Sequence, residues 1–313
     1  MATEESRAVE LTDASVRFGE VHALQGLSFF VRPGEMFGLV GPDGAGKTTA
    51  VRVLLGLVSL ETGSARVLGH DSAERSRELR DAVGYLSQGF SLYGDLTVAE
   101  NLEFYGEIHG VKGLKEARER LLTFTQLGPF RARRADKLSG GMQKKLALAC
   151  TLIHTPKVLF LDEPTTGVDP VARREFWRLL SELLASGLSV LLTTPYLDEA
   201  ERCGRVALLR EGRALACDSP AALRTGLGER VLEVICAPVR LARERLRASD
   251  RVLEVQLFGD RLHVVPRRGE DDLADLLRSL DGVHVSEARW VEPSLEDVFI
   301  RRVTDAAGEA ARV

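Results

Sequence analysis

A short glycine-rich stretch decides the fold: Gly41-Pro42-Asp43-Gly44-Ala45-Gly46-Lys47-Thr48, which fits the pattern G-x-x-x-x-G-K-[ST]. It follows the apolar run 36–40, which predicts a buried strand, and it opens a stretch with helical spacing, 47–57. Glycines let backbone N–H groups turn inward around phosphates, and the start of a helix adds its positive dipole. We predict a nucleotide-binding loop that extends to Thr49, with Lys47 on the β- and γ-phosphates and the Thr48 hydroxyl on Mg²⁺.

A second motif consists of two carboxylates at the end of an apolar run. Residues 158–161 predict a strand, and Asp162 and Glu163 follow directly. A carboxylate at a strand end can hold Mg²⁺ through water, and its neighbour can act as general base toward an attacking water. Together with the glycine-rich loop, this pair predicts a Mg²⁺-dependent nucleotide hydrolase.

Apolar runs and helical patterns alternate from about residue 9 to residue 218, which is typical of an α/β fold with a largely parallel sheet. Between residues 97 and 153 strand signals give way to amphipathic helices, which indicates a helical insertion. The predicted helices of this insertion are 97–109, 114–127 and 140–153. The other predicted strands of this part are 16–18, 27–31, 189–193 and 206–209.

The pattern changes after Pro220 to strand, helix, strand, strand, helix, strand, which suggests a small α+β, ferredoxin-like domain. Its predicted strands are 231–236, 252–258, 262–265 and 283–288, and its helices are 240–247 and 271–280. A last helix, 294–303, opens with a capping pattern in which Asp297 follows Ser294 by three residues. We expect the Ala/Gly/Glu-rich residues 304–313 to be disordered.

Composition limits the classes of function. The 313 residues carry 42 Lys+Arg and 46 Asp+Glu, a net charge of −4, which argues against nucleic-acid binding by bulk basic charge. No apolar run approaches the roughly 18–20 residues of a membrane-spanning helix. The four cysteines show no CxxC pairing, which favours reduced thiols over a disulfide framework or a zinc site. We expect a soluble, cytoplasmic protein.

A third motif points to a family. Ser139, Gly140, Gly141, Met142 and Gln143 follow Leu138 at the start of a predicted helix, which makes a second anion site without a lysine of its own. Such a loop makes sense if it closes over a nucleotide that another subunit holds. Here the sequence resembles the ATP-binding cassette (ABC) transporter ATPases. The loop is similar to their signature motif, with Met142 where glutamine is usual.

The resemblance assigns further roles. Phe18 takes the place of the aromatic residue that stacks on adenine. Gln88 takes that of a glutamine that contacts Mg²⁺ and the attacking water and senses the membrane partner. The stretch Thr165-Thr166-Gly167-Val168-Asp169 resembles the loop that crosses the dimer interface. In this family two cassettes sandwich two ATP molecules, each between one chain's phosphate loop and the other chain's signature.

Two segments resemble the ABC-2-type drug and antibiotic exporters, namely residues 91–102 and the terminal motif 293–300. The resemblance implies a P-loop cassette over 5–225, with a RecA-like core, an antiparallel β subdomain and a helical subdomain at about 90–155. The α+β domain would then cover 226–303. It also implies ATP and Mg²⁺ as cofactors and no nucleic acid. The implied partners are a second cassette and a separate transmembrane permease, which would hold the chain at the cytoplasmic face of the membrane.

One position departs from the family. Pro195 stands where such cassettes carry a switch histidine that hydrogen-bonds the γ-phosphate, and proline has no donor. We expect Tyr196 to point away from the site, because side chains alternate along an extended strand end. The site formed by this chain's own phosphate loop would then bind ATP and hydrolyse it slowly. Glu163 favours a transport ATPase, whereas Pro195 leaves open a regulatory cassette whose output is ATP occupancy.

Overall fold

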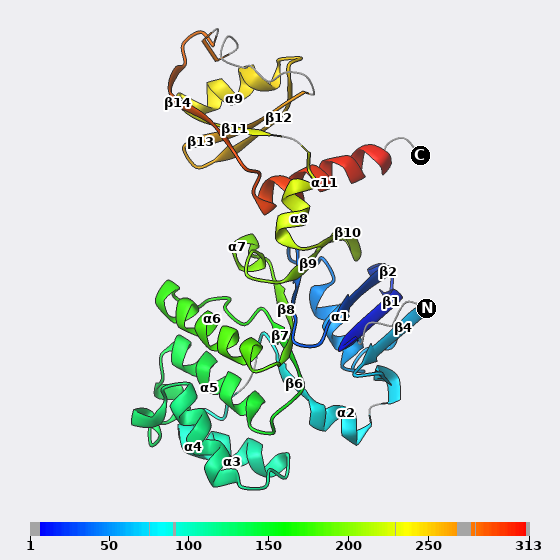
Figure 1. Cartoon of the computed structure of the whole chain (residues 1–313), viewed down its shortest axis with the longest axis vertical. Helices are drawn as coiled ribbons and strands as arrows, with labels where there is room; N and C mark the ends of the chain where they lie inside the picture. Colours follow the sequence, from blue (N-terminus) through cyan, green and yellow to red (C-terminus); the bar gives the residue numbers. More distant parts are fainter. Residues whose placement is uncertain are drawn as a thin grey trace. The chain divides into compact units, whose positions relative to one another are not determined.

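The computed structural model of the chain describes residues 7–74, 76–89, 92–228, 230–267, 277–278 and 280–310, and of 307–310 only the backbone. The chain forms two compact units, Met1–Ser219 and Pro220–Val313 (Figure 1). The division precedes Pro220 instead of following residue 225. The reason is that helix α8 (Pro220–Thr225) packs against α11 (Leu295–Ala310) of the second unit.

The first unit is built on a six-stranded sheet that is parallel except for one edge strand. Its order is β10 (Arg213–Asp218), β9 (Arg205–Arg210), β3 (Met36–Val40), β8 (Ser189–Thr194), β7 (Val158–Asp162) and β6 (Val83–Leu86). Every residue of β3, β7 and β8 is buried, as expected for central strands covered on both faces. Because these three strands are parallel, their carboxyl ends meet at one edge of the sheet.

A second, antiparallel sheet packs on the same core, which confirms the predicted β subdomain. Its order is β2 (Val21–Val31), β1 (Val9–Phe18), β4 (Thr62–Val67) and β5 (His70–Asp71). Strands β1 and β2 are longer than predicted, because exposed polar residues alternate with buried ones along them and interrupt the apolar runs. Helix α1 (Lys47–Leu54) lies between the two sheets, and its Val51 and Leu54 join one core with Leu11 and Phe37.

The helical insertion is also confirmed. It contains α3 (Val98–Ile108), α4 (Leu114–Phe124) and α5 (Gly140–Leu152), while α2 (Arg77–Ala82), α6 (Pro170–Ala185) and α7 (Leu197–Ala200) belong to the α/β core. Thr97 and Glu100 form a reciprocal capping box at the start of α3. The buried amide of Asn101 accepts from the Tyr93 N–H and donates to the Tyr93 carbonyl, at 3.0 Å in each case. The loop before α3 is thereby fastened to the helix; Ser91 at its start lies outside the described residues.

The second unit holds a four-stranded antiparallel sheet in the order β12 (Val252–Phe258), β13 (Arg261–Pro266), β11 (Val231–Ala237) and β14 (His284–Val291). Helix α9 (Val239–Arg247) packs on this sheet, with Ala242 and Leu246 fully buried. This confirms the predicted α+β domain. The predicted helix 271–280 falls mostly outside the described residues.

Helix α11 starts at the predicted cap and ends later than predicted. The Ser294 N–H donates to Asp297 Oδ2 at 2.7 Å, and the Asp297 N–H donates to Ser294 Oγ at 3.2 Å. The helix continues to Ala310, so the expectation of disorder from residue 304 is wrong for 304–310. The Ala-rich stretch has a high helix propensity, and Arg301 pairs with Asp305 one turn later at 3.2 Å. Within the part of the chain that the structure describes, no helix combines the length and apolarity needed to span a bilayer.

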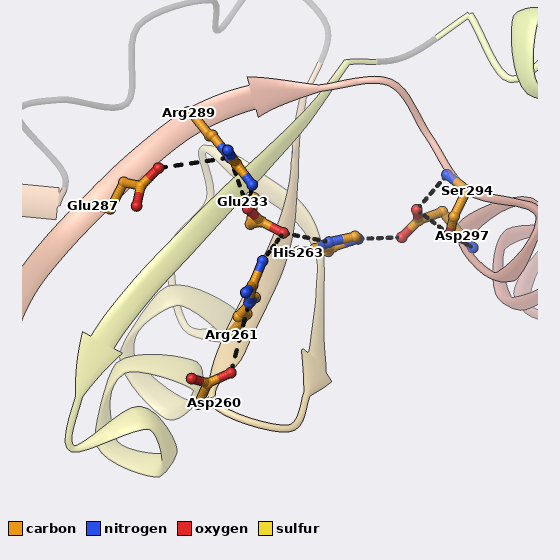
Figure 2. Close-up of polar contacts among 8 residues, drawn as sticks. All are labelled: Glu233, Asp260, Arg261, His263, Glu287, Arg289, Ser294 and Asp297. Carbon is orange, nitrogen blue, oxygen red and sulfur yellow. Dashed lines mark hydrogen bonds and ion pairs between the residues drawn. The ribbon is translucent and has the colours of Figure 1, made fainter.

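An ionic cluster with a buried centre and exposed arginines joins α11 to the sheet (Figure 2). The Asp297 side chain, 1% exposed, lies 2.9 Å from His263 Nδ1 on β13. His263 Nε2 lies 3.7 Å from Glu233 on β11, which also pairs with Arg261 at 3.2 Å and with Arg289 at 2.7 Å. The hydrogen bond to Asp297 raises the pKa of His263 above its ordinary value and outweighs burial. Burial alone would raise the pKa of Asp297, but bonds from His263 and Ser294 bring that pKa below its ordinary value.

The attachment of α11 is therefore expected to weaken as the pH rises above neutral. A histidine whose folded pKa is raised stabilises fully below its unfolded pKa of about 6.5, and this stabilisation is lost as the pH rises through the folded pKa. Asp297 behaves in the opposite way. Because its folded pKa is lowered, the stabilisation that it contributes is lost only when the pH falls into the acid range. Replacing His263 by Gln should reduce the protection of 294–303 from hydrogen exchange by about 1.5–3 kcal/mol at pH 6. Its effect should shrink at pH 9, and an equal effect at both pH values would contradict the prediction.

Candidate nucleotide-binding site

The glycine-rich loop connects β3 to α1, as predicted, at the sheet edge where the buried strands end. Gly46 has φ 98°, and a Cβ at this position would lie 2.6 Å from the Ala23 carbonyl oxygen. A side chain is excluded here by both the backbone conformation and the close approach of β2. The Gly41 N–H donates to the Thr194 carbonyl at 3.3 Å, which ties the loop to the end of β8.

Lys47 lies inside the loop, with its side chain 4% exposed. Its ammonium donates to the carbonyl oxygens of Gly41 at 2.8 Å and Pro42 at 3.1 Å. The same Nζ is 3.2 Å from Glu163 Oε1. The loop thus holds the Lys47 ammonium in a place where a phosphate oxygen could replace the two carbonyl oxygens and Glu163 as acceptors.

The first carboxylate of the acidic pair faces the loop's hydroxyl. Thr48 Oγ1 donates to Asp162 Oδ1 at 3.0 Å, and Thr193 Oγ1 of β8 donates to the same oxygen at 2.6 Å. Asp162 is 1% exposed. A hydroxyl and a carboxylate side by side are the oxygen donors that Mg²⁺ prefers, so Thr48 and Asp162 fit that ion.

The second carboxylate, Glu163, is set by an unusual backbone conformation. Its φ is 48°, which is uncommon for a residue with a side chain. Its N–H donates both to the carbonyl oxygen and to Oγ1 of Thr193, at 3.1 Å each. Gln88 donates to Glu163 Oε2 at 2.9 Å. The structure thus brings Lys47, Gln88 and Glu163 together: Lys47 contacts one oxygen of Glu163, and the Gln88 amide nitrogen contacts the other.

These groups line one cleft of about 760 Å³. Its walls come from the loop and from four other segments: Val21, His22, Ala23, residues 43–49, Gln88, Glu163, Thr166, Pro195 and Tyr196. The contribution of β2, including His22, was not predicted, because nothing in the sequence says that this strand of the second sheet approaches Gly46. Phe18 does not line the cleft; it is 53% exposed at the hairpin tip, paired with Val21, which does.

The signature-like loop begins α5 beside a second cleft of about 420 Å³, lined among others by Gly140 and Gln143. Ser139 caps the helix by accepting from the Met142 N–H at 3.3 Å. A Cβ on Gly141 would lie 2.3 Å from Ala172 Cβ, so close packing against α6 requires this glycine.

Asp169, the end of the stretch expected at the dimer interface, is the N-cap of α6. Its Oδ1 accepts from the N–H groups of Val171 and Ala172, at 3.0 Å each. Val171 beside it is 69% exposed. Within the described chain Asp169 therefore has a capping role, which the sequence motif alone did not reveal.

Pro195 and Tyr196 are both among the residues that line the main cleft, whereas strand alternation placed the Tyr196 side chain away from the site. Strand β8 ends at Thr194, so strand alternation no longer applies two residues later. The guanidinium of Arg173 lies 5.0 Å from the centre of the Tyr196 ring and holds it from the α6 side.

Lys144 links the two clefts and was also not predicted. It lies on α5 one residue beyond the signature-like loop, and its Nζ donates to the Gln88 carbonyl at 3.3 Å. Burial lowers its pKa below the ordinary value. In the sequence Lys144 is one of two adjacent lysines on a helix, so only the position of Gln88 in space distinguishes it.

A phosphate loop, a strand-end acidic pair and a serine-capped second loop on one α/β unit define a nucleotide-binding cassette of the ABC type. Residues 24–166 match the family model described as ABC transporter. Residues 219–303 match the model described as ATP-binding protein DrrA1-3-like, C-terminal domain.

Similar proteins and a solved structure indicate the same family. YbhF of Escherichia coli (strain K12), which carries the name "Probable multidrug ABC transporter ATP-binding protein", is 42% identical over 89% of this chain and 48% of its own length. The chain thus spans about half of that relative. The daunorubicin resistance ATP-binding protein DrrA2 of Streptomyces coeruleorubidus is 40% identical over 94% of both chains. A solved ATP-binding subunit of an ABC transporter matches with a TM-score of 0.64 at 29% identity, covering 71% of this chain and 93% of that one. The chain therefore belongs to the ABC transporter ATP-binding proteins.

Proposed function

We propose that this chain binds ATP with Mg²⁺ and hydrolyses it to drive the efflux of a drug or other hydrophobic substrate through a separate membrane permease. One observation carries the proposal: Lys47, Gln88 and Glu163 meet within hydrogen-bonding or ion-pair distance beside the Thr48–Asp162 contact. The names of the relatives, which refer to multidrug transport and daunorubicin resistance, support the export role.

The roles follow from the positions. Lys47 would move from its loop carbonyls and Glu163 to the β- and γ-phosphates, since a phosphate is the stronger acceptor. Thr48 and Asp162 would hold Mg²⁺, which neutralises phosphate charge and orients the γ-phosphate when bound. Once Lys47 leaves, the Glu163 carboxylate is available to accept a proton from water, with Gln88 holding its other oxygen.

The proposed partners follow from parts of the ATP site that one chain does not complete by itself. The signature-like loop, Ser139 to Gln143, has N–H groups at a helix start but no lysine, and would bind the γ-phosphate of ATP held by a second cassette. Residues 165–169 would lie at the same interface. We place the complex at the cytoplasmic face of the membrane, attached through the permease.

The direct test is ATP hydrolysis by the purified chain with Mg²⁺ and with EDTA. Hydrolysis that requires Mg²⁺ supports the proposal. No hydrolysis above the protein-free rate, with or without a partner cassette, would overturn it.

The missing switch histidine gives a further prediction. Replacing Pro195 by His should raise kcat by roughly 10- to 100-fold, because a hydrogen bond to a charged phosphate contributes about 1.5–3 kcal/mol. The measurement is kcat at saturating ATP, with Pro129 replaced by His as a control at a proline that does not line the cleft. An unchanged or lower rate in P195H would contradict the hypothesis that this position limits turnover.

A regulatory cassette whose output is ATP occupancy remains the rival function, and Pro195 in the cleft wall is the observation that favours it. The two functions differ in the wild-type rate. A transport ATPase turns over when the permease is supplied, whereas an occupancy sensor stays slow with the permease present.

A further inference from the structure

Glu199 is a buried carboxylate that the ATP-binding roles described above do not use. It lies on the short helix α7, directly after β8, and its side chain is 1% exposed. An ionised carboxylate in such a position is costly unless hydrogen bonds and a counter-charge compensate its desolvation. The groups that compensate it come from three separate segments of the first unit.

Two threonine hydroxyls donate to it. Thr165 Oγ1 donates to Glu199 Oε1, and Thr194 Oγ1 donates to Glu199 Oε2 at 2.7 Å. Both threonines are themselves buried, at 1% and 0% exposure. Each carboxylate oxygen is thus bonded to a different segment: the interface segment (residues 165–169), which follows the acidic pair, and the switch segment (residues 194–196).

The hydroxyl that bonds to Glu199 also holds the switch segment. Because the Thr194 hydroxyl gives its one proton to Glu199, its lone pairs face the chain, and it accepts the Tyr196 N–H at 3.0 Å. The Thr194 carbonyl accepts the Gly41 N–H of the phosphate loop at 3.3 Å. Pro195 lies between these two anchors.

Arg173 on α6 supplies the counter-charge. Its Nε is 3.8 Å from Glu199 Oε1, and its guanidinium packs on the Tyr196 ring. Helix α6 begins at the Asp169 cap, which ends the interface segment. The Glu199 carboxylate therefore bonds the switch segment and the interface segment at the same time, and the Arg173 guanidinium contacts both this carboxylate and the Tyr196 ring of the switch segment.

We propose that Glu199 is a positioning residue that couples these two segments, so that a change at the ATP γ-phosphate and a change at the partner cassette move them together. The inference rests on the proposed function, because the interface segment matters only if a second cassette binds there. A mere helix-stabilising acid on α7 would need neither burial nor a bond from each segment.

Glu199→Gln tests this coupling. The amide presents an NH₂ to one of the two hydroxyls, and that hydroxyl then loses the acceptor for its own proton. Amide hydrogen exchange in the nucleotide-free full chain should rise in both segments, by about tenfold for the loss of one buried hydrogen bond. Steady-state kcat for ATP should fall by a similar factor, with KM within about twofold. Thr194→Val, which removes one hydroxyl, should raise exchange in the switch segment, and the kcat loss of the double variant with E199Q should be smaller than the two single losses combined.

Glu35→Gln is the matched control, because Glu35 is a carboxylate of the same unit with 10% side-chain exposure and an arginine partner at 3.6 Å. It should change neither segment. Faster exchange in only one segment, or in neither, would overturn the coupling, as would strictly additive losses in the double variant. The exchange measurement needs no turnover, so it separates this inference from the proposed function, which fails if the chain shows no ATP hydrolysis above the protein-free rate.

Discussion

Replacing Glu163 by Gln is expected to lower kcat for ATP hydrolysis by about 100-fold or more, the contribution of a well-placed general base. The amide keeps the shape of the side chain and can still bond to Gln88, but it cannot accept a proton at neutral pH. Binding of ATP should persist, because Lys47 and the loop N–H groups remain. The measurements are steady-state hydrolysis and equilibrium binding of a fluorescent ATP analogue.

The matched control for this variant is Glu175→Gln, since Glu175 lies on α6 and pairs with Lys145 away from the cleft. Its kcat should stay within about twofold of the wild type, as is usual for surface carboxylates. If E163Q retained most of its activity, the base would have to be another group. If it lost ATP binding as well, Glu163 would be required for the loop's structure instead of for proton transfer.

The second large effect is expected for Lys47→Ala, which should weaken ATP binding by about 100-fold. The ammonium forms charge-assisted hydrogen bonds, and losing roughly 3 kcal/mol of such contacts corresponds to this factor. The change also leaves Glu163, which is 7% exposed, without its cation. Removing one partner of a buried ion pair typically costs about 3–5 kcal/mol, so the unfolding free energy should fall as well.

A double variant separates these two consequences of losing Lys47. Glu163→Gln added to Lys47→Ala removes the uncompensated charge, so it should restore much of the stability while ATP binding stays weak. The measurements are thermal unfolding without nucleotide and nucleotide binding on the same samples. Equal ATP affinity in K47A and the wild type would contradict the assigned role of Lys47.

The parts of the site that were predictable are contiguous in sequence. The loop from Gly41 to Thr48 and the strand-end pair Asp162 and Glu163 are short motifs, and their residue types and spacing already carry the chemistry. The strands β3 and β7 around them are continuous apolar runs, which is why their bounds were close to the predicted ones. The capping pair of α11 is local in the same way.

The parts that were not predictable depend on segments distant in the chain. The surroundings of Tyr196 were not predictable, because Thr194, two residues before it, bonds to Glu199, whose other partner Thr165 is 34 residues away from Glu199. Gln88 and Glu163 are in contact although they are 75 residues apart in the sequence, and no local sequence pattern predicts such a contact. Strands β1 and β2 were predicted too short because their polar face interrupts the apolar signal.

The sequence by itself determined the class of this protein, an α/β nucleotide-binding cassette with a small α+β domain after it, because phosphate binding requires a glycine-rich backbone and a lysine in one short order. Only the tertiary structure decided how the site is held. It placed Lys47 on Glu163, gave Asp169 a capping role, and put the buried Glu199 between the switch and interface segments. Apart from the local cap at Asp169, these contacts join side chains that are far apart in the chain and that meet where parallel strands end at one edge of the sheet. The spacing of residues in the sequence does not show which of them will meet.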